Sequence, residues 1–186
     1  MKERIKLNTP FGDSDLSALR AGDMLYISGT IYTARDAAHK KMCELLQQGE
    51  PLPFNPEGTA VYYAGPAPAK PGKPIGSIGP TTSGRMDLYS PTLIKKGLKV
   101  MIGKGIRSKE VIEAIVEAKG VYFAAIGGAA ALMAKCVKSA QVIAFEELGP
   151  EAVRKLEVEE LPVVVAIDST GRDLYKEAIE KNRQEF

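Results

Sequence analysis

The feature that most constrains the fold is the regular alternation, from residue 90 onward, of short apolar runs with segments typical of helices. The apolar runs are expected to be strands, and they cover residues 98–102, 121–125, 142–145 and 161–167. The expected helices cover residues 90–97, 108–119, 127–137 and 172–184. Short continuous apolar runs separated by helices are typical of strands buried on both faces. The sequence therefore predicts an α/β fold with a largely parallel central sheet.

Local signals set the expected helix ends. Ser90 and Ser108 are predicted to be N-caps, and the proline after Ser90 suits the first helical position. In the first half, a strand at 24–28 leads to a helix at 34–48. There Thr33 and the acid three residues later resemble a capping box.

Residues 51–80 contain eight of the 12 prolines, interrupted by a short strand expected at 60–64. Because proline lacks a backbone N–H, this segment is expected to be extended rather than helical. A flexible linker is the competing interpretation, but the aliphatic and tyrosine side chains of the segment give it surface to bury. The whole chain, residues 1–186, is therefore expected to be one domain, with this segment adding β structure at one end.

Charge and cysteine content exclude several classes of function. The net charge of +2 comes from interleaved acids and bases, which argues against nucleic-acid binding. His39, Cys43 and Cys136 are too few and too dispersed for a usual zinc site, and we expect buried thiols, although a Cys43–His39 nucleophile pair stays open. No stretch approaches about 18 apolar residues, and the N-terminus lacks an apolar leader. We expect a cytoplasmic protein without membrane contact.

The segment 79–87, Gly-Pro-Thr-Thr-Ser-Gly-Arg-Met-Asp, looks like a ligand-binding loop. Its three hydroxyls lie between two glycines that can adopt a positive φ, and the guanidinium of Arg85 follows the second glycine directly. A guanidinium matches a carboxylate or a phosphate bidentately. The loop therefore indicates an anion site, and a plain polar turn is the alternative.

Three cations are flanked by glycines or lie close to turns. Arg35 begins the first long helix, Arg85 lies in the hydroxyl-rich loop, and Lys104 lies between two glycines. Ligands sit at strand ends in open α/β sheets. Each cation alone could be a solvated surface residue, but together they suit a small molecule with two carboxylates.

Two glycine motifs are weaker signals. Gly-x-Gly at 103–105 lacks the third glycine of a dinucleotide fingerprint, since Ser108 occupies that position. Gly127-Gly128 could bring a helix N-terminus to a phosphate, but close packing of small residues explains it equally well. A nucleotide-binding module therefore remains an alternative.

Taken together, these motifs resemble the β subunit, or C-terminal domain, of class I (iron–sulfur) fumarate hydratases and L-tartrate dehydratases. The resemblance covers nearly the whole chain. The segments that carry it are residues 21–23, 27–40, 78–87, 101–105, 126–131 and 161–168.

The resemblance implies a single swivelling β/β/α domain that completes an active site shared with an α subunit. It implies a four-iron [4Fe–4S] cluster ligated by three cysteines of that α subunit, with no cofactor bound by this chain alone. The expected reaction is hydration of fumarate to malate, and the expected assembly is a heterotetramer. This chain should be inactive without its partner.

The resemblance also implies roles for individual residues. Arg35, Arg85 and Lys104 match ligands of the substrate carboxylates. Thr81 matches a hydroxyl placed for proton transfer, which would need help because a threonine is a poor base. The cysteines match no cluster ligand.

One departure leaves the substrate open. Many members carry an aromatic or acidic residue within 150–159, where this chain has Ala-Val-Arg-Lys at 152–155. Fumarate hydratase is the first hypothesis, and L-tartrate dehydratase or a mesaconate hydratase is the alternative. Two alternatives are not enzymes: a stand-alone anion-binding module and a purely structural subunit.

Overall fold

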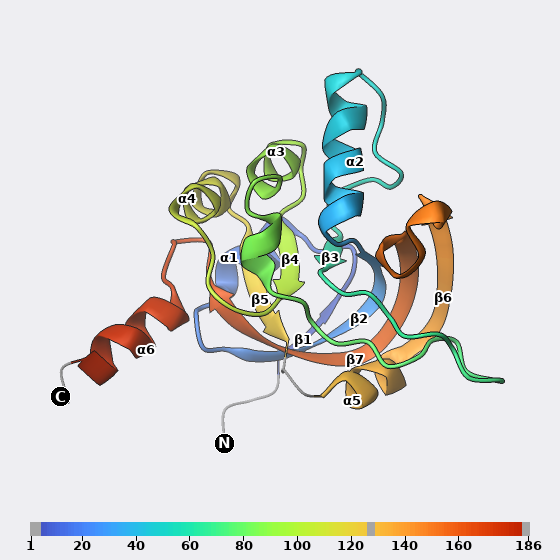
Figure 1. Ribbon diagram of the computed structural model, residues 1–186. Helices are drawn as coiled ribbons and strands as arrows, with labels where there is room; N and C mark the ends of the chain where they lie inside the picture. Colours follow the sequence, from blue (N-terminus) through green and yellow to red (C-terminus); the bar gives the residue numbers. More distant parts are fainter. Residues whose placement is uncertain (1–4, 126–128, 184–186) are drawn as a thin grey trace.

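The computed structural model describes residues 5–125 and 129–183, which form a mixed α/β structure (Figure 1). The strands are β1 (Ile5–Asn8), β2 (Met24–Thr33), β3 (Ala60–Tyr62), β4 (Val100–Gly103), β5 (Val121–Ala125), β6 (Val137–Ala144) and β7 (Val153–Ile167). The helices are α1 (Asp13–Ala18), α2 (Asp36–Gln47), α3 (Ser90–Lys95), α4 (Lys109–Ala118), α5 (Ala130–Cys136) and α6 (Leu174–Arg183). Two short 3₁₀ helices complete the set, η1 (Ser83–Met86) and η2 (Glu146–Glu151).

The sheet has the strand order β1-β2-β3-β4-β5-β7-β6, with an additional pairing between β2 and β7. The pairs from β1 to β5 are parallel, whereas β7 runs antiparallel to β2, β5 and β6. The predicted α/β class is therefore confirmed, but the sheet is mixed rather than largely parallel. Because β7 pairs with both β2 and β5, the strands β2, β3, β4, β5 and β7 form a closed ring of pairings.

Alternate residues of the strands belong to two different cores. On β3, Tyr62 joins one cluster that collects side chains from every strand of the ring, while its neighbours Val61 and Tyr63 join a second cluster. The second cluster lies under α2, α3 and α4, which Figure 1 shows on one side of the strands. The period-2 alternation of a strand produces this division.

Several predictions of local structure are confirmed. Ser108 is the N-cap of α4 and its hydroxyl accepts from the Val111 amide at 3.4 Å. The C-cap of α4 is Lys119, just before Gly120. The strand predicted at 121–125 matches β5 residue for residue.

Other predictions are wrong in detail. The proline-rich segment does not add a strand at one end, because β3 lies between β2 and β4 in the sheet. Ser90 is the first residue of α3 rather than its cap, since Tyr89 is the N-cap and the Ser90 hydroxyl donates to the Met86 carbonyl. Thr33 does not cap α2, because it is the last residue of β2 and Arg35 is the N-cap.

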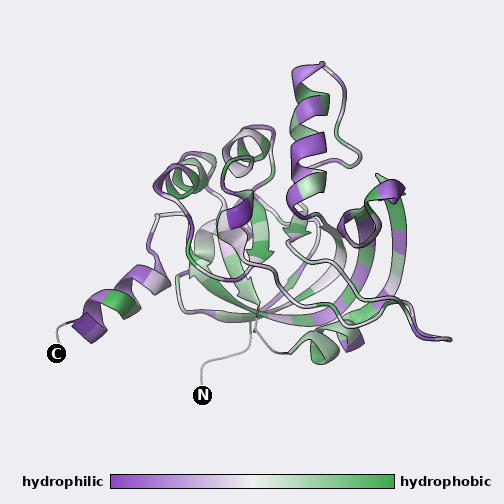
Figure 2. Cartoon of the chain, in the orientation of Figure 1, coloured by the Kyte–Doolittle hydropathy of each residue, from purple (hydrophilic) through white to green (hydrophobic). Residues whose placement is uncertain are grey.

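The last helix differs from the others. No residue of α6 is buried, and Figure 2 shows it as largely hydrophilic, projecting from the body of the molecule. Asp168, just after β7, organises the turn before it by accepting from the amides of Thr170 and Arg172. Within the part of the chain that the structure describes, no helix has the length and apolar character needed to cross a membrane.

Candidate functional site

The carboxyl ends of β2, β3 and β4 lie level with one another at one edge of the sheet. Thr33 pairs with Tyr62, and Tyr62 pairs with Ile102, in parallel register. Arg35 follows β2 and Lys104 follows β4. Two of the predicted site residues therefore emerge at the edge where open sheets bind ligands.

The hydroxyl-rich loop crosses the same edge. Its backbone is bonded to the ends of β3 and β4, since the Thr81 amide donates to the Tyr63 carbonyl at 2.7 Å and the Ser83 amide donates to the Lys104 carbonyl at 2.9 Å. Thr82 also forms a parallel bridge with Lys104. The fold thus brings Thr81, which is half-buried, to the strand ends that carry Arg35 and Lys104.

The loop then forms η1, which has one long side chain buried in the protein and the other exposed to solvent. Met86 is fully buried in the second core, while the side chain of Arg85 is 51% exposed. The expectation that Gly79 and Gly84 adopt a positive φ is wrong, because neither does; Gly84 lies inside η1. The short helix, rather than glycine freedom, therefore directs Arg85 outward.

Gly103 and Gly105 have structural reasons to be glycine. A Cβ at Gly103 would stand 2.0 Å from the Ser83 hydroxyl, and Gly105 has a φ of +86°. The buried Ser83 hydroxyl accepts from the Lys104 amide at 3.0 Å and from the Tyr122 phenol at 2.9 Å. The Gly-x-Gly motif therefore fixes the turn that carries Lys104, which weakens the dinucleotide interpretation.

Asp36 brings the two predicted arginines together. One of its carboxylate oxygens lies 2.7 Å from Arg85 Nε, and the other lies 3.8 Å from Arg35 Nε. Arg35 Nε and Asp36 Oδ2 are both buried without a hydrogen-bond partner among the described residues. Lys104 is exposed beside the loop. Arg35 and Arg85 thus meet at Asp36, with donor capacity left for a ligand, and Lys104 emerges at the same edge of the sheet.

Glu151 is a site residue that sequence reasoning missed. It lies at the end of η2, where one carboxylate oxygen is 3.3 Å from Arg35 Nη2 and the other accepts from the Ala37 amide at 2.9 Å. One N–H group in the first turn of α2 is thus capped from a segment 114 residues away. No local sequence motif could have predicted a capping residue so distant in sequence.

His39 and Cys43 do not form a nucleophile pair. His39 is fully buried, shares a hydrogen bond of 2.9 Å between its Nδ1 and the Arg35 carbonyl, and packs edge-on against Tyr63. Burial lowers the pKa of His39 to about 4, so its imidazole is neutral at pH 7. Burial raises the pKa of the Cys43 thiol, the opposite of what an activated nucleophile needs. His39 and Cys43 are therefore packing residues behind the site. The prediction of buried thiols is confirmed for Cys43 but not for Cys136, which is half-buried.

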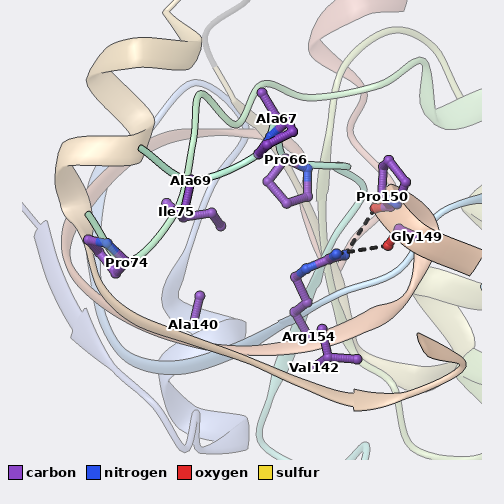
Figure 3. Close-up of a pocket in the computed structure, with 11 residues that line it drawn as sticks. Pro66, Ala67, Ala69, Pro74, Ile75, Ala140, Val142, Gly149, Pro150 and Arg154 are labelled. Atoms are coloured by element: carbon purple, nitrogen blue, oxygen red, sulfur yellow. Dashed lines mark hydrogen bonds between the residues drawn. The ribbon is translucent and has the colours of Figure 1, made fainter. Parts of the chain in front are cut away.

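A cavity of about 280 Å³ lies next to this edge, between the proline-rich segment and strands β6 and β7 (Figure 3). Its lining is mainly apolar, with proline, alanine and Ile75 side chains on one side. Arg154 points across it and donates to the carbonyls of Gly149, Pro150 and Ala152 at 2.8–3.2 Å. These bonds hold the main chain that carries Glu151.

The chain's own side chains do not suit an iron–sulfur cluster. Such clusters are held by cysteine thiolates, and this chain has two cysteines, Cys43 on α2 and Cys136 on α5. Among residues 5–125 and 129–183, no three His, Cys, Asp or Glu side chains gather into a group that could hold a metal ion. The phosphate site considered at Gly127-Gly128 lies outside the described residues.

Fold and site together define an α/β domain that presents cations and hydroxyls at the carboxyl ends of parallel strands, an arrangement suited to a small anionic ligand. Residues 1–178 match the family model described as "Fumarase C-terminus". The chain belongs to this family, as the resemblance predicted.

Relatives of two kinds match. Fumarate hydratase 2 of Leishmania major is 42% identical over 166 residues, which are 88% of this chain and 29% of that protein. The anaerobic class I fumarate hydratase of Escherichia coli (strain K12) is 39% identical over 96% of this chain and 33% of its own length. The "putative L(+)-tartrate dehydratase subunit beta" of Methanocaldococcus jannaschii is 43% identical over 90% of this chain and 89% of its own length. The chain thus spans about a third of the length of the fumarate hydratases.

Proposed function

We propose that this chain is the β subunit of a two-subunit hydro-lyase that hydrates fumarate to malate. The observation that carries the proposal is the convergence of Arg35, Arg85 and Lys104 at the ends of parallel strands, in a family whose named relatives are fumarate hydratases and a tartrate dehydratase β subunit. The whole chain would act as one C-terminal-type, swivelling domain in the cytosol. It would be inactive alone.

In this proposal the cations bind and orient the diacid. The guanidinium of Arg85 holds a carboxylate through its two terminal nitrogens, and Arg35 donates through the terminal nitrogen that Glu151 does not contact. Lys104 adds a mobile positive charge. A fixed set of donors lowers the entropy that the substrate loses in reaching its reactive geometry. Thr81 places its hydroxyl beside the bound diacid, where it takes part in proton transfer with the help of a stronger neighbouring base.

The partner must supply what this chain lacks. Its two cysteines are too few for the cluster that the family resemblance implies, so we assign the [4Fe–4S] cluster to a cysteine-bearing α subunit in a heterotetramer. When bound, such a cluster supplies a Lewis acid for the substrate hydroxyl and carboxylate. The residues of this chain then contribute the charged wall that faces it.

The test is activity of the complex formed with the α subunit. Arg85→Ala and Lys104→Ala are each expected to lower kcat/KM for malate dehydration by a factor of about 100 or more, as lost charge-assisted contacts do. Losses below about threefold in both variants would remove the site assignment. Turnover by this chain purified alone and free of iron would overturn the two-subunit proposal.

L-Tartrate dehydratase is the second candidate, and a specific observation favours it. The tartrate dehydratase β subunit is the relative described above that this chain matches over most of its length, 89%. Assaying one reconstituted preparation with malate and with L-tartrate separates the two functions. The higher kcat/KM identifies the substrate.

A further inference from the structure

We propose that Asp36 and Glu151 are positioning residues that fix the two substrate-binding arginines of this site. This inference rests on the proposed function and names the residues that would make it work. Neither acid is placed to bind a negatively charged substrate. Each instead contacts a guanidinium that we assign to the substrate.

The charge balance of the site makes these acids informative. Arg35, Arg85 and Lys104 together with Asp36 and Glu151 leave a formal charge of only +1 facing a substrate of charge −2. If attraction of the diacid were the sole requirement, both carboxylates would weaken it. Their position therefore calls for another role, and holding flexible cations in one geometry is a role that an adjacent carboxylate can perform.

Asp36 contacts Arg85 at Nε and not at the two terminal nitrogens of the guanidinium. Its Oδ1 lies 2.7 Å from Arg85 Nε, so both terminal nitrogens of that guanidinium remain for a carboxylate ligand. Asp36 is also the first residue of α2, where the helix dipole favours a negative charge. Its side chain is 28% exposed, which limits screening by water.

Glu151 contacts a terminal nitrogen of Arg35. One oxygen lies 3.3 Å from Arg35 Nη2, and the other caps α2 at the Ala37 amide, so the carboxylate is anchored on the helix whose N-cap is Arg35. The carbonyl of the preceding residue also approaches closely. A Cβ at Gly65 would lie 2.9 Å from the Pro150 oxygen and 3.1 Å from Arg35 Cδ. Arg35 is thus enclosed by η2 and the end of β3.

The loop that presents Glu151 is itself held in place. The Arg154 guanidinium donates to the carbonyls of Gly149 and Pro150, as Figure 3 shows, and also to that of Ala152, all within 3.2 Å. Three donated bonds to carbonyls within four consecutive residues fix the end of η2. The line of contacts from Arg154 through η2 to Glu151 and Arg35 therefore links β7 to the substrate edge.

The experiment is steady-state kinetics of the reconstituted two-subunit enzyme with malate. Asp36→Asn and Glu151→Gln remove charge at nearly constant shape, and the Gln oxygen can still accept from the Ala37 amide. We expect kcat/KM to fall about 10- to 100-fold in Asp36→Asn and about 3- to 10-fold in Glu151→Gln, in the range seen for residues that orient a ligand-binding group. A purely electrostatic role predicts the opposite sign, because removing a negative charge would tighten binding of the diacid.

Double-mutant cycles separate positioning from general destabilisation. If Asp36 acts through Arg85, its substitution should change kcat/KM less than twofold when Arg85 is already alanine, and the same should hold for Glu151 in an Arg35→Ala background. Glu147→Gln is the matched control. That residue also lies on η2 but pairs with Lys41 on the exposed surface, and its substitution should leave kcat/KM unchanged.

The outcomes distinguish this inference from the function on which it rests. If Arg85→Ala and Lys104→Ala both change kcat/KM by less than about threefold, the site assignment fails as a whole. If Arg85→Ala abolishes activity while Asp36→Asn and Glu151→Gln leave kcat/KM unchanged or raise it, the positioning role alone is wrong. Additive effects in both cycles, with kcat/KM falling equally in either background, would also overturn it.

Discussion

Arg85 and Arg107 lie at the two sides of the same loop, yet the structure uses them in opposite ways. The side chain of Arg107 is completely buried, pairs with Asp87 at 2.7 Å and donates to the Ser90 hydroxyl at 2.8 Å. Its guanidinium also lies 5.3 Å and 4.9 Å from the ring centres of Tyr63 and Tyr122. Arg85 is half-exposed and contacts Asp36.

The difference teaches how to separate a structural cation from a ligand-binding one. Burial alone would lower the pKa of Arg107, but Tyr63 and Asp87 more than offset this and raise it, so the buried charge is kept. Every side of that guanidinium has a partner. Arg85 keeps unused donors facing outward, which a structural role does not require.

The largest effect we expect is loss of stability in Arg107→Ala. The substitution leaves the Asp87 carboxylate, whose side chain is 12% exposed, without its cation and opens a space between two tyrosine rings. Breaking a buried pair in this way costs about 3–5 kcal/mol. Urea unfolding of the isolated chain measures it, and a change below about 1 kcal/mol would mean that Arg107 is not the structural cation described here.

The next effect concerns His39 and pH. In the unfolded chain His39 becomes protonated below a pKa of about 6.5, whereas in the folded protein its pKa is about 4. The free energy of unfolding therefore falls as the pH drops from 6.5 towards 4. Between pH 7 and pH 5 this amounts to about 2 kcal/mol in the free energy of unfolding. His39→Gln should remove that part of the pH dependence. An equal slope in both proteins would contradict a buried, neutral His39.

Ser83→Ala tests the hydrogen bonds that link the turn at Lys104 to Tyr122, beside which Arg107 packs. The variant leaves the Lys104 amide without its acceptor and removes a partner of the Tyr122 phenol, which can still donate to the Gly105 carbonyl. We expect a loss of about 1–2 kcal/mol in unfolding free energy. Because the lost bond holds the Lys104 turn, kcat/KM of the complex should fall as well. Unchanged kinetics would show that the turn does not depend on Ser83.

The smallest effect on stability is expected for Arg85→Ala. Its ion pair with Asp36 involves a half-exposed guanidinium, and such pairs contribute about 0–1 kcal/mol. Urea unfolding should therefore barely change in the variant that loses most activity. A loss as large as that of Arg107→Ala would erase the distinction between the two residues.

The sequence by itself determined the features that depend on neighbouring residues. The alternation of strands and helices, the Ser108 cap and the ends of α4 all follow from contacts within a few positions, so their patterns were readable. The motifs also identified Arg35, Arg85 and Lys104 as residues that belong together. In the structure Arg35 and Arg85 both contact Asp36, and Lys104 follows β4 beside the same loop, while their role in binding remains a proposal.

Only the tertiary structure decided which distant segments meet. The first half of β7 was missed because charged residues dominate 154–160, although this stretch pairs with β2 on one side and with β6 on the other. The cap of α2 came from Glu151 rather than from Thr33, and Arg107 was not recognised as buried. Strand pairing and ion pairing across more than 100 residues depend on the packing of the whole chain, and a local pattern contains no information about that packing.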